Sequence, residues 1–195
     1  MKKILVLAIL VFTTITVSAQ LFKGQEKNAE EPTTGIVPIV NGKVTFEETI
    51  PAEGYTAEEI NEIVSSWIKE RFVKPTVISA RLFDSGKPGT TVLRGEEYLV
   101  FKSTALVLER ARIYYYLTIT ANDGSCTFNM SRITYWYDDE DDKGGLKMKA
   151  EEWITDNNAF NKKGKMKKFE GKFRNKTIGL KDMLVKELKE RLVKR

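Results

Sequence analysis

The residues able to carry out chemistry in this chain are few, and histidine is not among them. Without histidine the chain has no His-based catalytic triad, no His-ligated metal and not the commonest general base near neutral pH. The single cysteine, Cys126, falls on the apolar phase of a predicted central strand, which indicates a buried, inert thiol rather than a nucleophile. The sequence has no glycine-rich phosphate loop. We therefore predict no catalytic residue, no cofactor and no metal site.

Three pairs of adjacent glutamates, Glu47-Glu48, Glu58-Glu59 and Glu96-Glu97, are the remaining candidates for acid–base work. Neighbours in a strand point to opposite faces, so such a pair does not converge on a substrate. We expect solvated charges at these positions. An enzyme that uses carboxylates alone is consequently the least favoured function.

An acidic run from Asp138 to Asp142 could hold Ca²⁺. It does not fit an EF-hand loop, because Lys143 stands where the loop requires a ligand or a glycine. We expect a solvated loop, with weak cation binding or a counter-charge for the basic part of the chain as alternatives.

A set of aromatic side chains is the sharper candidate, for binding rather than catalysis. The stretch Arg110 to Asp138 alternates apolar and polar residues with a period of two, and Asn122-Asp123-Gly124 is typical of a tight hairpin turn between two long strands. One face of this hairpin and of the preceding strand is then open, and it carries Tyr98, Arg112, Tyr114, Tyr116 and Trp136. Exposed aromatic residues usually mark an interaction surface, suited here to a protein partner or a sugar ring.

The position of Trp136 on this face depends on a β-bulge. Cys126, Phe128 and Met130 alternate, and then Ile133 and Tyr135 continue one residue out of step. A bulge near Ser131-Arg132 returns both groups to the buried face and leaves Trp136 on the open one. The alternative to a binding surface is that the N-terminal arm or the segment around Trp153 covers the face.

The elements that position these residues can be predicted in order. They are a hairpin of Ile36–Val40 and Lys43–Ile50 around Asn41-Gly42, a helix from Thr56 to Pro75, strands Val77–Phe83 and Thr91–Ser103, the long hairpin, a short helix within Ala150–Phe160 and a closing helix Thr177–Val193. Thr56 and Glu59 form a capping box, and Trp67 lies at the centre of the apolar face of the first long helix. We predict an α+β fold: a single antiparallel sheet packed on one face by two main helices, in the order β-α-β-β-β-β-α, with an extra N-terminal hairpin or arm.

The first residues are typical of a secretory signal. Lys2 and Lys3 precede the apolar run Ile4–Val17, and Val17-Ser18-Ala19 is a small-residue cleavage site. The domain organisation is then a signal peptide (1–19), a flexible arm (20–35) and one domain (36–195). No later stretch is long enough to span a bilayer, and the residue directly after the cleavage site is Gln20 rather than a cysteine that could carry a lipid. We expect an exported protein, periplasmic or extracellular, that is not a lipoprotein.

Basic residues are concentrated near the C-terminus. Residues 160–195 carry 14 basic and 4 acidic groups, against 16 and 23 in residues 20–159. We predict an irregular Lys-rich connection over residues 161–176, whose candidate contacts for an anionic surface are Lys162, Lys163, Lys165, Lys167 and Lys168. Because export argues against nucleic acid, the alternatives are a merely solvated connection or contact with anionic headgroups or acidic polysaccharide.

Several motifs resemble one known family. They are Val44-Thr45-Phe46-Glu47 before a glycine and a capped helix, Val77-Ile78 after that helix, the turn at Gly86, and the Tyr-rich strand that leads into Asn122-Asp123-Gly124. In this order they are similar to the bacterial secreted domain-of-unknown-function family with a fold like the TATA-binding protein, over roughly Ile39 to Val193. The resemblance implies a fold and no activity, ligand or site residue, and it gives no warrant for DNA binding.

Three functions remain open, in this order. The first is a non-enzymatic exported module that binds a protein, a glycan or an anionic surface through its open sheet face or its Lys-rich segment. The second is a carrier with a cavity between helix and sheet, lined by Trp67, Tyr115 and Phe128. The third is the carboxylate-only enzyme.

Overall fold

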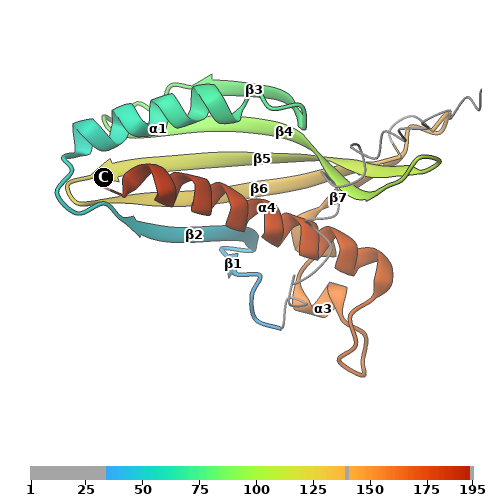
Figure 1. Cartoon of the computed structure of the whole chain (residues 1–195). Helices are drawn as coiled ribbons and strands as arrows, with labels where there is room; N and C mark the ends of the chain where they lie inside the picture. Colours follow the sequence, from blue (N-terminus) through green and yellow to red (C-terminus); the bar gives the residue numbers. More distant parts are fainter. Residues whose placement is uncertain (1–33, 139–140, 194–195) are drawn as a thin grey trace, which may run out of the picture. The chain divides into compact units, whose positions relative to one another are not determined.

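The structure, a computed structural model, describes residues 34–138 and 141–193 (Figure 1). The predicted signal peptide and most of the predicted arm lie outside these residues. The strands are β1 (Ile39–Val40), β2 (Lys43–Pro51), β3 (Val77–Phe83), β4 (Thr90–Ser103), β5 (Leu108–Asn122), β6 (Ser125–Tyr137) and β7 (Leu146–Lys149). The helices are α1 (Ala57–Arg71), α2 (Ala150–Trp153), α3 (Asp156–Ala159) and α4 (Lys168–Leu192).

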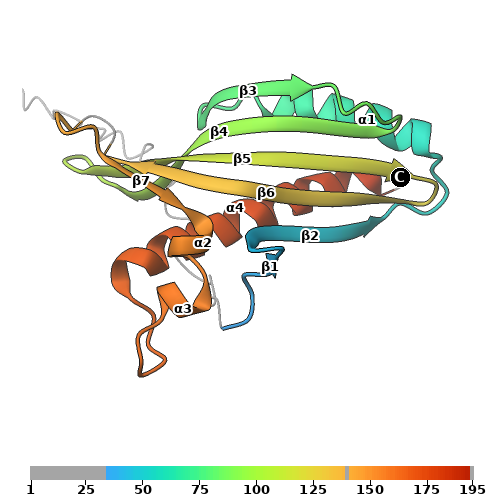
Figure 2. The same cartoon turned by 180° about the vertical axis from the view of Figure 1, so that it is seen from behind.

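All strands join one antiparallel sheet in the order β1-β2-β6-β5-β4-β3, with β7 paired to β6. The outer edge of β6 is shared between two partners (Figure 2): its residues 125–131 pair with β2, and its residues 134–137 pair with β7. The predicted bulge lies between these two parts, where the register against β5 shifts at Tyr114 and Tyr116 and Arg132 has a φ of 53°. The bulge therefore lets one long strand change partners while its apolar residues stay on the same face.

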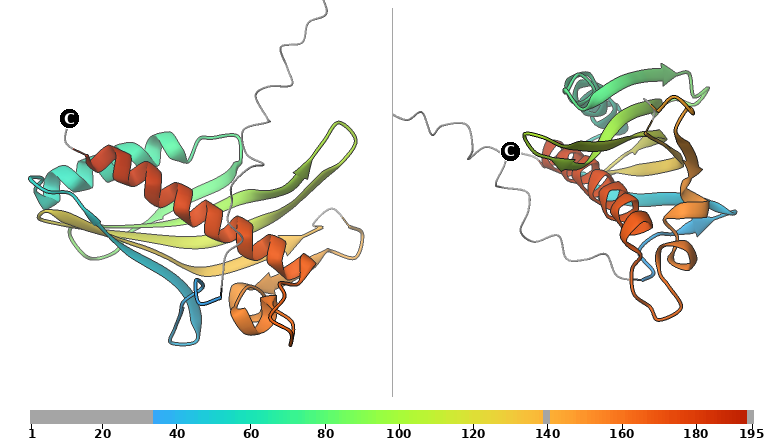
Figure 3. Two further views of the ribbon diagram at one scale, coloured as in Figure 1. Left: turned by 60° about the horizontal axis from the view of Figure 1, so that its bottom comes forward. Right: turned by 90° about the vertical axis from the view of Figure 1, so that its right-hand side faces the viewer.

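The two long helices α1 and α4 lie side by side on one face of the sheet (Figure 3, left). Their apolar stripes meet the inward side chains of β4, β5 and β6, among which Ile113, Tyr115 and Phe128 have no exposed surface. The opposite face carries neither of these helices (Figure 2). The predicted α+β fold with one covered face is thus confirmed, with β7 and α3 added to the predicted order.

Helix α1 begins as predicted. Thr56 accepts a hydrogen bond from the amide of Glu59, whose carboxylate accepts one from the amide of Thr56 at 2.8 Å. The turn between β5 and β6 adds a third contact, since the Asp123 carboxylate accepts a hydrogen bond from the amide of Ala57 at 2.8 Å. Trp67, at the centre of the helix, is 1% exposed. The helix is therefore fixed to the hairpin at its start and to the core along its length.

The predicted Lys-rich connection was wrong in its second half, because α4 begins at Lys168 rather than at Thr177. Phe169 and Phe173 are four residues apart and pack together at a centroid distance of 5.5 Å, so an aromatic stripe runs beneath the lysines. Lys172 lies among these rings, 4.1 Å from the Phe169 centroid, and pairs with Glu109. The lysine stems therefore cover apolar surface, which the charge pattern alone does not reveal.

Arg174, also in the predicted connection, is completely buried. It donates to the carbonyl of Ile154 at 2.6 Å and pairs with Asp156 at 2.7 Å. The other oxygen of Asp156 accepts a hydrogen bond from the amide of Gly35 at 2.6 Å. Arg174 thereby joins α4 to the start of α3, and Asp156 joins both to the last residue of the predicted arm.

Candidate functional site: the open sheet face

The register of the sheet places a row of alternating aromatic and cationic side chains across four strands. Tyr98 of β4 lies opposite Arg112 of β5, Arg112 lies opposite Trp136 of β6, and Trp136 lies opposite Lys147 of β7. Side chains directly opposite each other on one face of an antiparallel pair are close enough to interact. The row is thus a continuous surface built from residues that are far apart in the sequence.

Every aromatic ring of the predicted surface has a cation over it. The distances from cation to ring centroid are 3.9 Å for Arg110 on Tyr98, 5.7 Å for Arg94 on Tyr114, 5.0 Å for Arg132 on Tyr116, 5.3 Å for Arg112 on Trp136 and 4.7 Å for Lys147 on Trp136. A cation over a ring face is attracted by the ring's quadrupole. We expected exposed rings, but all four are half-buried, because the arginines lie over them.

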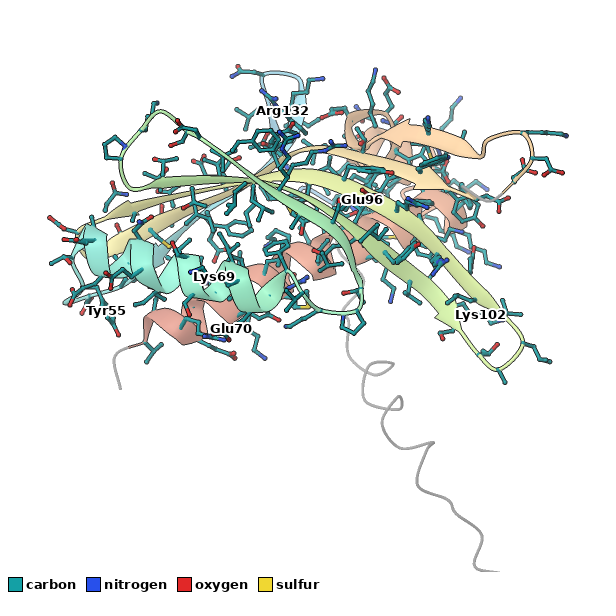
Figure 4. All side chains as sticks on the ribbon, turned by 90° about the horizontal axis from the view of Figure 1, so that it is seen from above. Tyr55, Lys69, Glu70, Glu96, Lys102 and Arg132 are labelled. Atoms are coloured by element: carbon teal, nitrogen blue, oxygen red, sulfur yellow. The ribbon has the colours of Figure 1, made fainter. Side chains whose placement is uncertain are left out.

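The pattern extends to the edge of the sheet. Phe83 of β3 lies 5.9 Å from Tyr116 between ring centroids, and Arg81 lies 5.1 Å from the centroid of Phe83. In the view from above, Arg132 lies on the side of the sheet away from α1, which carries Lys69 and Glu70 (Figure 4). The open face therefore presents aromatic rings beneath positive charge from β3 to β7.

The charge on this face is not balanced within the described part of the chain. Glu96 accepts a hydrogen bond from Arg112 at 3.2 Å. In residues 34–138 and 141–193, by contrast, no carboxylate forms an ion pair with Arg81, Arg94, Arg132 or Lys147. A surface with cations that lack counter-charges attracts anionic partners.

Trp136 is held in one orientation. Its indole Nε1 donates a hydrogen bond to the carbonyl of Gly144 at 2.8 Å. The turn that follows requires glycine at position 145, because φ is 64° there and a Cβ would collide with the carbonyls of Tyr137 and Asp138. This turn brings β7, and with it Lys147, back beside Trp136.

A hollow of about 620 Å³ opens on this face beside Trp136. It is lined by Arg94, Tyr114, Thr134, Tyr135, Trp136, Lys147, Met148, Lys149 and Glu152. Burial, and next the neighbouring Glu96 carboxylate, raise the pKa of Tyr114, so its phenol stays protonated at neutral pH. The hollow is therefore bordered by three aromatic residues, of which Tyr135 is buried, and by three cations and one carboxylate.

The segment around Trp153 does not cover the rings. Trp153 packs edge-on against Phe169 and Phe173 of α4, on the covered side of the sheet. Only Glu152, its neighbour, borders the hollow. The other proposed cover, the arm, lies in residues outside the described ones except at its end.

The Lys-rich candidates lie apart from this face, in the turn between α3 and α4 and at Lys168, the first residue of α4 (Figure 1). Lys162, Lys163, Lys165 and Lys168 are exposed, whereas Lys167 is half-buried and pairs with Glu170 at 3.3 Å. Gly171 lets this turn pack on α4, since a Cβ there would lie 2.7 Å from the side chain of Met166. The turn is a small loop in which Lys162, Lys163 and Lys165 are solvated.

Glu97 is the exception to the expected solvated glutamates. It is 2% exposed, pairs with the buried Arg71 at 2.7 Å and accepts a hydrogen bond from the hydroxyl of Tyr115. Desolvation, and next the Glu97 carboxylate, raise the pKa of Tyr115 well above its usual value. The prediction of a solvated pair was wrong at Glu97, because alternation on β4 sends Glu96 outward and Glu97 into the core.

The carrier hypothesis placed a cavity among Trp67, Tyr115 and Phe128. These side chains are packed in the described core. A hollow of about 260 Å³ between α1 and α4 is lined by Trp67 but by neither Tyr115 nor Phe128. Among the described residues no group of acidic or cysteine side chains is arranged to hold a metal ion. The acidic run includes residues 139–140, which are outside the described ones.

Sequence reasoning found only Arg112 among the cations of this site and missed the others, among them Arg94, Arg132 and Lys147. The alternation of β4 carries the signal for Arg94, which shares the phase of Tyr98. Arg132 is the bulge residue itself, and Lys147 lies in β7, a strand too short to stand out from its sequence. These three residues lie on different strands, and only the register between the strands brings them to one surface.

Comparisons with known proteins agree with the fold. The model of the family described as "Domain of unknown function (DUF4468) with TBP-like fold" matches residues 46–136. A crystal structure of a DUF4468 family protein from Bacteroides ovatus is 32% identical with a TM-score of 0.74, over 84% of this chain and 94% of that one. A TBP-like protein from Parabacteroides distasonis is 24% identical with a TM-score of 0.65, over 80% of this chain and 96% of that one. No curated protein matches the sequence, and none of the described helices is both long and apolar enough to cross a membrane.

Proposed function

Because this chain belongs to the DUF4468 family of domains of unknown function with a TBP-like fold, we propose its function from its own open face: a non-enzymatic binding module for an anionic partner. We further propose that it acts outside the cytoplasm, after removal of residues 1–19. The basic, apolar and small-residue order of the first residues supports export.

One observation carries the binding proposal: cations lie over aromatic rings in a row, and several of them lack a carboxylate partner among the described residues. A folded protein gains little from leaving charges unpaired on one face, whereas an anionic partner gains from each of them. The arginines are stacked on rings and so lose less side-chain freedom on binding. The face is thus prepared for anion recognition.

The test compares binding of three defined anionic materials: polygalacturonate, poly-glutamate and vesicles that contain phosphatidylglycerol. The full chain should bind at least one of them, with an affinity that falls as salt rises. The double variant Arg94→Ala/Arg132→Ala should lose most of this binding. The matched control Lys162→Ala/Lys163→Ala removes the same charge from the solvated turn and should bind like the parent.

Two further variants separate binding from folding. Tyr116→Ala and Trp136→Ala should weaken binding yet melt within a few degrees of the parent, since their rings are half-buried at the surface. Destabilisation with retained binding would return these aromatics to a structural role. Loss of binding in the turn control alone would move the site to the Lys-rich segment.

A further inference from the structure

We propose that the hollow beside Trp136 binds a carboxylate-bearing sugar residue of an acidic glycan. This inference rests on the proposed function and adds the chemical class of the partner. It rests on four features of this hollow: the aromatic residues that form its floor, the cations around them, the polar lining groups and the volume.

The floor of the hollow suits a sugar ring. Tyr114 and Trp136 line it together, from adjacent strands, and Trp136 is fixed by its hydrogen bond to Gly144. The C–H face of a pyranose packs against the parts of these half-buried rings that Arg94, Arg112 and Lys147 leave exposed, where apolar area meets a polar edge. A fixed ring loses little freedom when the ligand binds.

The charges around the floor suit a carboxylate. Arg94 and Lys147 are exposed and have ring contacts but no carboxylate partner within the described residues. Lys149 pairs with Glu152 at 3.3 Å, but the two side chains are 60% and 65% exposed, so that pair is weak and solvated. Two or three cations are therefore available to one anionic group.

The remaining lining groups favour a sugar over an acidic peptide side chain. Thr134 offers a hydroxyl and Glu152 a carboxylate, which can exchange hydrogen bonds with sugar hydroxyls. Glu152 repels any acid group, so the ligand's carboxylate must lie toward Arg94 and Lys147. An acidic peptide side chain would leave Glu152 and Thr134 without partners, whereas a ring with one acid and several hydroxyls offers a partner to each of them. The volume, about 620 Å³, holds one or two sugar rings.

The experiment measures binding of a defined tetramer of galacturonic acid to the full chain, by calorimetry and by tryptophan fluorescence. The neutral tetramer of galactose has the same rings without carboxylates and should bind at least about tenfold more weakly. Arg94→Ala and Lys147→Ala should each weaken binding of the acidic tetramer about tenfold, while Lys162→Ala/Lys163→Ala leaves it unchanged. Trp136→Phe should abolish the fluorescence change and retain the fold.

The outcomes separate this inference from the proposed function. Equal binding of the neutral tetramer, or binding of poly-glutamate but not of the acidic tetramer, overturns the sugar assignment and leaves an anion-binding face. If polygalacturonate, poly-glutamate and anionic vesicles all fail to bind, both the sugar assignment and the proposed anion-binding function are overturned. Far-UV circular dichroism and melting of each variant show that a loss reflects the site, because Arg94 and Lys147 are exposed and contribute little to the core.

Discussion

Replacement of Glu97 by alanine should destabilise the protein far more than the same replacement at its neighbour Glu96. The two residues differ only in the face to which they point. Glu97 is 2% exposed and lies 2.7 Å from the guanidinium of Arg71, which is 1% exposed. Its loss leaves a buried cation without its main partner and the hydroxyl of Tyr115 without its acceptor.

The magnitude follows from these contacts. Removal of one partner of a buried ion pair costs about 3–5 kcal/mol. Arg71 keeps a second contact, with Glu187 at 3.5 Å, which places the expected cost for Glu97→Ala at the lower end, about 3 kcal/mol. Glu96 pairs with Arg112 near the surface, where the two side chains are 16% and 29% exposed, so Glu96→Ala should cost about 1 kcal/mol or less.

Urea unfolding of the parent and both variants, followed by far-UV circular dichroism at one pH, measures these differences. The double variant Arg71→Met/Glu97→Met removes both charges and should recover much of the loss, because apolar residues of similar size replace buried ion pairs at little cost. A free energy of unfolding for Glu97→Ala within about 1 kcal/mol of that for Glu96→Ala would refute the buried pair, since two solvated glutamates would behave alike.

Three other predictions concern the core and the N-terminus. Trp67→Ala should cost about 3–5 kcal/mol, because this ring is 1% exposed, and a thermal melt within a few degrees of the parent would contradict its position. Burial raises the pKa of the Cys126 thiol from 9.0 to about 11, so above pH 9 the unfolded chain releases a proton that the folded chain keeps. The free energy of unfolding should therefore fall between pH 9 and 11, and it should fall less steeply in the Cys126→Ala variant. Exported material should begin at Gln20, and an intact mass that retains Met1 would disprove cleavage after Ala19.

The helix and strand pattern was predictable because it depends on neighbours in the sequence. The capping box at Thr56, the apolar spacing around Trp67 and the alternation of β5 are local signals, and each is present in the structure. The bulge at Arg132 was also visible, because it shifts the phase of an otherwise regular strand. The beginning of α4 was not, because the lysines around Phe169 and Phe173 hide a helical stripe that forms only against the core.

The sequence by itself determined which side chains share a face, since a strand alternates with a period of two whatever it pairs with. That placed Tyr98, Tyr114, Tyr116 and Trp136 together on the open side. Only the tertiary structure decided what lies next to each ring, because contacts across strands depend on register and on which strand follows in the sheet. Lys147 reaches Trp136 only through the pairing of β7 with β6, and Glu97 finds Arg71 only where α1 crosses the strands. The alternation of the strands thus predicted the aromatic surface, whereas the pairing of the strands brought the cationic side chains next to its rings.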